Sequence, residues 1–141
     1  MAPSHRILCA DDDLSVRAGV VDLLTGIGLD VLEAESGLEA IELARASRID
    51  AALLDLHMPG CTGIEALPRL RELRRGLPCL VYSGDWTDPL RDLAFSAGAF
   101  GILPKPIRPE LLKSEILRAL EAWPDGFLGP DPFNRRASHG A

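Results

Sequence analysis

Short apolar runs alternate with amphipathic stretches along the whole chain. The apolar runs have the length of strands buried on both faces, and they predict strands at residues 6–10, 30–34, 51–55, 79–83 and 100–103. Between and after them, apolar residues recur at spacings of three and four, which predicts helices at residues 16–27, 38–46, 64–75, 88–97 and 109–123. This alternation predicts an α/β fold with a parallel sheet, right-handed crossovers and helices on both faces.

Two of these helices carry local signals at or near their starts. Ser36 precedes the second helix as an N-cap, and Glu39 three residues later completes the pattern of a capping box. Pro68 falls within the third helical pattern. A proline is tolerated in the first turn of a helix and kinks the helix further along, so Pro68 predicts either a late start or a kink.

Length and composition predict one globular domain with a terminal extension. The 141 residues suffice for a single core, and the 47% apolar content argues against disorder. We expect the domain to span residues 1–123. Residues 124–141 lose the apolar periodicity and contain three prolines and three glycines, so they predict a tail or linker stub.

Charge and hydropathy exclude several partners. The net charge of −6 argues against extensive electrostatic binding of nucleic acid. No apolar run has the length of a membrane span, and residues 1–10 lack the layout of a signal peptide, so we expect a cytoplasmic protein.

The three cysteines show no CxxC spacing and predict neither a disulfide framework nor a zinc site. Cys9 and Cys79 fall in strands, whereas Cys61 in a loop is the candidate reactive thiol.

Carboxylates gather at the ends of two predicted strands. Asp11, Asp12 and Asp13 follow the first strand, and Asp55 ends the third. Ligands of open α/β sheets bind at this edge, and Asp13 can also cap the helix that follows. If the strands are neighbours, each like-charged pair costs roughly 3 kcal/mol at about 5 Å and an effective dielectric of about 20. A divalent cation with oxygen ligands would relieve that repulsion.

Taken together, residues 5–122 resemble the receiver domain of two-component response regulators. The resemblance rests on four motifs in a fixed order: the acidic run of residues 7–13 with Arg17, residues 53–60 with Gly63, residues 81–84, and residues 98–101 leading to Lys105-Pro106. It implies a flavodoxin-like, doubly wound (βα)5 fold with strand order 2-1-3-4-5.

The resemblance also implies a phosphoacceptor site. Asp55 would accept a phosphoryl group from a sensor histidine kinase or a histidine phosphotransfer protein. Magnesium (Mg2+) would be held by Asp11, Asp12, Asp55 and the backbone carbonyl of His57. Lys105 and Ser83 would contact the phosphoryl group, and Pro106 implies a cis Lys105–Pro106 bond. The chain would thus be a signalling domain in a phosphorelay and no enzyme beyond its own phosphorylation and dephosphorylation.

One departure from the family pattern keeps alternatives open. Ile102 stands where the family usually has Tyr or Phe, whose ring moves on activation. A pseudo-receiver, which binds partners without phosphorylation, is therefore a second hypothesis. The third is a magnesium-dependent phosphohydrolase of the aspartyl-phosphate type, but that class needs an acid where this chain has His57. The sequence leaves open a homodimer, the downstream output partner and the identity of the kinase.

Overall fold

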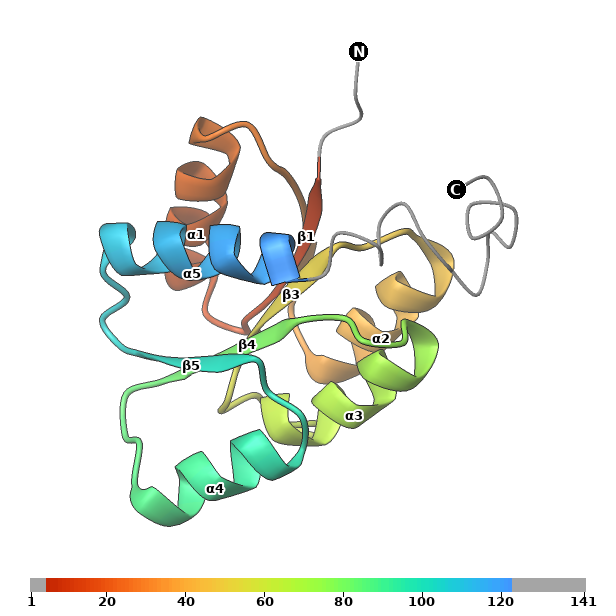
Figure 1. Cartoon of the computed structure of the whole chain (residues 1–141), viewed down its shortest axis with the longest axis vertical. Helices are drawn as coiled ribbons and strands as arrows, with labels where there is room; N and C mark the ends of the chain where they lie inside the picture. Colours follow the sequence, from red (N-terminus) through yellow and green to blue (C-terminus); the bar gives the residue numbers. More distant parts are fainter. Residues whose placement is uncertain (1–4, 123–141) are drawn as a thin grey trace.

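The five strands form one parallel sheet in the order β2-β1-β3-β4-β5 (Figure 1). The computed structural model describes residues 5–122, so Trp123 and the predicted tail at 124–141 lie outside the described residues. The strands are β1 (Arg6–Ala10), β2 (Asp30–Ala34), β3 (Ala51–Asp55), β4 (Cys79–Ser83) and β5 (Gly101–Pro104). The helices are α1 (Leu14–Gly26), α2 (Gly37–Ala46), α3 (Gly63–Leu73), α4 (Asp88–Ser96) and α5 (Pro109–Ala122). The predicted doubly wound fold and strand order are confirmed.

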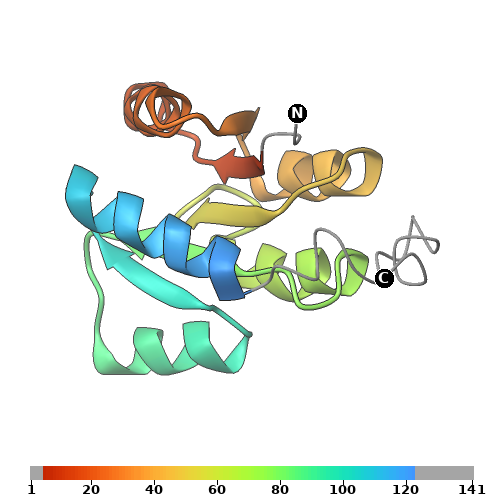
Figure 2. The ribbon, with the colours of Figure 1, turned by 45° about the horizontal axis from the view of Figure 1, so that its top comes forward.

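Two apolar cores lie on opposite faces of the sheet. Helices α1 and α5 cover one face, where Val20, Leu24 and Ile116 pack on the strands. Helices α2, α3 and α4 cover the other face, where Ile41 and Leu67 are among the buried residues. Figures 1 and 2 show these helix layers with the sheet between them. Strands β3 and β4 are buried at every position, which explains why they read as unbroken apolar runs.

Side-chain caps fix the starts of helices α1 to α4. Asp13 accepts hydrogen bonds from the backbone N–H groups of Ser15 and Val16, as predicted for the cap of α1. Ser36 caps α2 as predicted, but the Glu39 carboxylate accepts the N–H of Glu35 instead of that of Ser36. The predicted reciprocal box is therefore wrong at α2.

The third helix starts earlier than its apolar pattern predicts. Thr62 and Glu65 form a full capping box, so α3 begins at Gly63. Pro68 consequently lies beyond the first turn, and the helix nevertheless continues to Leu73. Gly63 is required here, because a Cβ at this position would lie 2.6 Å from the backbone oxygen of Asp55. Helix α3 thus packs directly against the end of β3.

Smaller differences concern β5 and a cysteine. Strand β5 covers Gly101–Pro104, one residue later than predicted, because Gly101 pairs with Leu80 and Pro104 with Ser83. The prediction of a reactive Cys61 is wrong. Its side chain packs where a Cβ on Gly37 would stand, and burial raises the pKa of its thiol.

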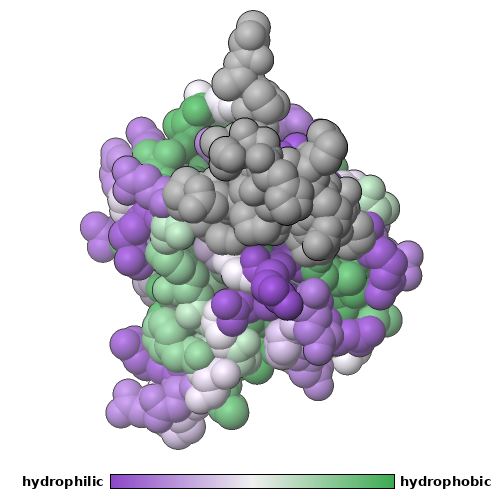
Figure 3. All heavy atoms as spheres, turned by 45° about the vertical axis from the view of Figure 1, so that its right-hand side comes forward, coloured by the Kyte–Doolittle hydropathy of each residue, from purple (hydrophilic) through white to green (hydrophobic). Residues whose placement is uncertain are grey.

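The surface mixes hydrophilic and hydrophobic residues. On the face shown in Figure 3, purple hydrophilic areas border smaller green hydrophobic ones. The large apolar side chains that are exposed come from several helices: Leu14, Leu38, Leu93, Phe95 and Leu117. Within residues 5–122, none of the helices is long and apolar enough to cross a membrane.

Candidate functional site

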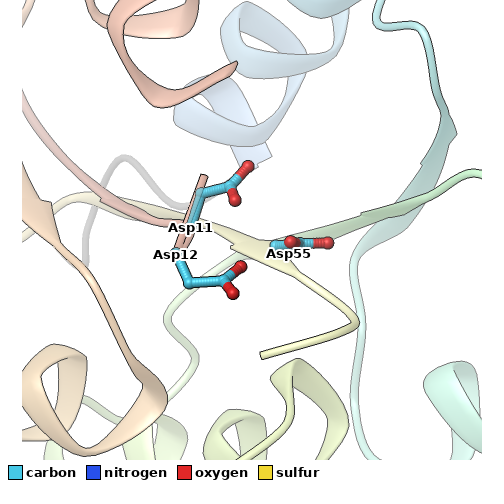
Figure 4. A group of neighbouring side chains, drawn as sticks. All are labelled: Asp11, Asp12 and Asp55. Atoms are coloured by element: carbon cyan, nitrogen blue, oxygen red, sulfur yellow. The ribbon is translucent and has the colours of Figure 1, made fainter. Parts of the chain in front are cut away.

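Three carboxylates meet at the carboxyl end of the sheet. Asp11 and Asp12 follow β1, and Asp55 is the last residue of the neighbouring strand β3. Each contributes one oxygen to a group in which all the oxygens lie within 4.8 Å of one another (Figure 4). Asp11 and Asp55 are buried, whereas Asp12 is exposed. The predicted convergence of these side chains is therefore present.

Protein donors hold Asp11 from several sides. Its Oδ1 accepts the backbone N–H of Asp13 at 2.8 Å, and its Oδ2 accepts the Tyr82 hydroxyl at 2.6 Å. The guanidinium of the buried Arg17 donates to the Asp11 backbone carbonyl at 2.6 Å and to Glu33 at 2.9 Å. Burial and the Asp11 contact raise the pKa of Tyr82 far above its usual value, so its hydroxyl stays protonated and donates.

Asp55 is paired with Lys105. The Lys105 Nζ lies 3.2 Å from Asp55 Oδ1, and the backbone N–H of His57 donates to the same oxygen at 3.3 Å. Burial, followed by the charge of Asp11, raises the pKa of Asp55 to about 6, and Lys105 opposes this shift. Lys105 follows β5 and precedes Pro106 through a cis peptide bond, as the resemblance implied.

Ser83 and His57 both contact Asp85. The buried Ser83 hydroxyl donates to Asp85 Oδ1 at 2.5 Å, and the exposed His57 Nε2 lies 2.7 Å from that oxygen. The hydrogen bond from Ser83, together with that from His57, holds the pKa of Asp85 below its ordinary value. Ser83 therefore stands at the end of β4 as predicted, with its hydroxyl directed to Asp85. The role of the His57 carbonyl as a metal ligand stays a prediction.

The carboxylate cluster fits a magnesium ion. Magnesium prefers hard oxygen ligands and retains several waters, so it needs a few carboxylates at a site open to solvent. Asp11 and Asp55 supply buried carboxylates, and the exposed Asp12 lies on the solvent side of the cluster. Three carboxylates face one nearby ammonium group, that of Lys105, within the part of the chain that the structure describes. A divalent cation would balance this excess of negative charge.

The family of this chain follows from comparison with known proteins. Residues 7–117 match the family described as the response regulator receiver domain. The chain belongs to this family. The response regulator MprA of Mycobacterium leprae (strain TN) is 39% identical over 115 residues, which cover 82% of this chain and 50% of MprA. The cyclic di-GMP phosphodiesterase response regulator RpfG of Xanthomonas campestris pv. campestris (strain 8004) is 34% identical over 119 residues, covering 82% of this chain and 32% of RpfG.

Solved structures of receiver domains agree with this fold. The chemotaxis protein CheY4 of Vibrio cholerae superposes with a TM-score of 0.80 at 30% identity, over 84% of this chain and 100% of CheY4. The receiver domain of the sensor histidine kinase PA1611 from Pseudomonas aeruginosa PAO1, a structure with a magnesium ion in its active-site cleft, gives 0.77 at 23% identity over 84% of this chain and 99% of that one. The chain spans about one third of the length of RpfG and half of the length of this MprA.

Two residues around this receiver site were missed as functional candidates. Arg17 was recognised only as part of a motif, and its contact with the Asp11 carbonyl depends on the fold. Tyr82 belongs to a predicted strand and to the motif at residues 81–84, but neither gives its side chain a role. A usable signal existed, because a tyrosine in a strand buried on both faces needs a hydrogen-bond partner for its hydroxyl.

Proposed function

We propose that this receiver domain accepts a phosphoryl group on Asp55, with magnesium, from a sensor histidine kinase or a histidine phosphotransfer protein. The observation that carries the proposal is the meeting of Asp11, Asp12 and Asp55 with the Lys105 ammonium, which lies 3.2 Å from Asp55. The class of phosphoryl donor and the role of the chain in a phosphorelay are parts of this proposal. Any activity of a longer protein that contains the domain is also a matter of proposal.

The transfer requires a carboxylate to attack an anionic phosphoryl group. An Asp55 oxygen forms a bond to phosphorus while the bond from phosphorus to the donor's imidazole nitrogen breaks. The electron pair of the broken bond stays on that nitrogen, and the product is an aspartyl phosphate. Magnesium, when bound, supplies charge neutralisation and in-line geometry.

The side chains around Asp55 have distinct roles in this proposal. Asp11 and Asp12, together with Asp55, hold the metal ion. Lys105, already paired with Asp55, becomes the counter-charge of the phosphoryl group. Ser83 donates its hydroxyl to a phosphoryl oxygen, for which its present hydrogen bond to Asp85 has to break.

Intact mass spectrometry tests the assignment of Asp55. The protein is incubated with magnesium and a small acyl phosphate or phosphoramidate, and it should gain the mass of one phosphoryl group. Asp55→Asn should remove that gain while keeping the fold. Asp13→Asn is the matched control, because Asp13 caps α1 and should leave the gain intact. A phosphoryl gain that persists in Asp55→Asn contradicts the assignment.

The same experiment separates the alternative functions. A pseudo-receiver, which Ile102 in place of the usual aromatic residue favours, should gain no phosphoryl group under any of these conditions. A phosphohydrolase should instead consume the donor over many turnovers. That reaction needs an acid two residues after the nucleophile, and here the residue is His57.

A further inference from the structure

We propose that Tyr82 is a positioning residue of the acidic site, whose hydroxyl fixes the Asp11 carboxylate and whose ring supports Lys105. This inference rests on the proposed function, because it concerns the metal and phosphoryl chemistry at Asp55. It assigns a role to the single tyrosine of the chain, which the sequence motifs leave without one.

The sheet places Tyr82 directly beside Asp55. The two residues are register partners in the parallel pair β3–β4, and the backbone carbonyl of Tyr82 accepts the N–H of Leu56 at 2.9 Å. The Tyr82 side chain is fully buried in the core beneath α1 and α5. From this position its hydroxyl reaches Asp11 at the end of β1, the strand on the far side of β3.

The hydroxyl contact is short and charge-assisted. Tyr82 donates to Asp11 Oδ2 at 2.6 Å, in the range of hydrogen bonds from a hydroxyl to a carboxylate. The other carboxylate oxygen accepts the N–H of Asp13. Each oxygen of Asp11 is thus fixed by one protein donor, which sets the plane of the carboxylate and leaves the remaining lone pairs for the metal ion or its waters.

The ring of the same side chain faces a cation. The Lys105 Nζ lies 5.2 Å from the centroid of the Tyr82 ring, within the range of a cation–π interaction. That ammonium is also 3.2 Å from Asp55 Oδ1. Tyr82 therefore contacts an acidic and a basic member of the site, one on each side of Asp55.

These two contacts predict separable effects. Groups that orient metal ligands through hydrogen bonds change metal affinity when they are removed, typically by about 10-fold to 100-fold. Loss of the hydroxyl should therefore weaken magnesium binding. Loss of the ring should in addition slow phosphorylation at saturating magnesium, because Lys105 loses a surface that holds it near Asp55.

A double-mutant cycle tests the hydroxyl contact. Magnesium is titrated calorimetrically into the wild type, Tyr82→Phe, Asp11→Asn and the double variant. Tyr82→Phe should raise the dissociation constant for magnesium about 10-fold. In the Asp11→Asn background, the same substitution should change that constant less than about twofold. An unchanged affinity in Tyr82→Phe overturns the proposal, and so does an equal loss in both backgrounds.

Two further variants separate positioning from stability. Leu80→Val alters the same core two residues away from Tyr82 in β4 and should leave magnesium affinity unchanged. A loss of magnesium affinity in Leu80→Val equal to that in Tyr82→Phe overturns the proposal.

The role of the ring is tested by phosphorylation with a small acyl phosphate at saturating magnesium. The rate should be near that of the wild type in Tyr82→Phe and lower in Tyr82→Leu. Equal rates in these two variants overturn the role of the ring.

The outcomes also distinguish this inference from the proposed function. If the wild type binds magnesium but gains no phosphoryl group, the proposed function fails and the magnesium cycle still tests the hydroxyl contact. If the wild type binds no magnesium, both are overturned.

Discussion

Asp55 is ionised at a cost to the folded protein. Its carboxylate is buried next to Asp11, and one ion pair with Lys105 offsets only part of the penalty. Because burial and the Asp11 charge raise its pKa to about 6, the folded state binds this proton more tightly than the unfolded state. The stability that the neutral form provides is present at acidic pH and is lost as the pH rises from about 4 to about 6.

Asp55→Asn should therefore stabilise the metal-free protein above that range. We expect the free energy of unfolding at about pH 7.5 to rise by roughly 2–3 kcal/mol, and the difference from the wild type to disappear near pH 3.5. Urea denaturation with a chelator present measures both values. A stability difference that is the same at both pH values would contradict this account of Asp55.

Asp12 and Asp13 are adjacent residues with different tasks. Asp12 contributes an oxygen to the carboxylate cluster, whereas Asp13 caps α1 through the N–H groups of Ser15 and Val16. Asp12→Ala should abolish magnesium binding without loss of stability in the metal-free protein, because it relieves repulsion. Asp13→Ala should lower stability by about 1 kcal/mol and retain magnesium affinity. Calorimetric titration and urea denaturation of both variants check this, and similar behaviour of the two would refute the division of tasks.

Among the elements, the connection between β4 and α4 links the site to the sheet edge. At its start, the Ser83 hydroxyl donates to Asp85. Further along, the half-buried Trp86 donates its indole N–H to the backbone carbonyl of Leu103 in β5, at 2.7 Å. The adjacent Ile102 is a β-branched residue with restricted χ1, so it offers no ring that can change between inward and outward positions.

Phosphorylation should therefore be detectable at Trp86. If Ser83 leaves Asp85 for a phosphoryl oxygen, the segment that carries Trp86 shifts and its contact with Leu103 changes. We expect the tryptophan fluorescence to change on phosphorylation in Trp123→Phe, which leaves Trp86 as the only tryptophan. Ser83→Ala is the control and should reduce the change. Constant emission beside complete phosphorylation by mass would show that this connection does not respond.

At the scale of the molecule, the sequence predicted the architecture because each strand is a separate local signal. Strands such as Ala51–Asp55 and Cys79–Ser83 are apolar throughout since helices cover both faces of the sheet, and their bounds were predicted correctly. The acidic cluster was predicted on the condition that β1 and β3 are neighbours, because the carboxyl ends of parallel neighbours share one edge. Their adjacency came from the strand order that the resemblance implied, and the sheet has that order.

What could not be predicted depends on contacts between distant residues. The burial of Cys61 requires Gly37 beside it, and no local pattern reveals that pair. The hydrogen bond from Tyr82 to Asp11 joins residues 71 positions apart. The sequence indicates that a buried tyrosine hydroxyl needs a partner, but it does not identify Asp11 as that partner. The start of α3 at Gly63 could have been predicted, because the capping box of Thr62 and Glu65 is a local signal. The prediction relied on the spacing of apolar residues instead.

The order of the strands along the chain has a consequence for synthesis on the ribosome. A domain generally folds as one unit, so its sheet is complete only after the last strand has been synthesised. Asp11 and Asp12, which follow β1, and Asp55, which ends β3, are synthesised before β4 brings Tyr82 and before Lys105 follows β5. A nascent chain that pairs β1 with β3 thus gathers the negative charges before their hydroxyl donor and ammonium partner have been made. Charge repulsion among these carboxylates opposes early pairing of β1 with β3, which is consistent with folding of the whole sheet as one unit after Lys105 has been synthesised.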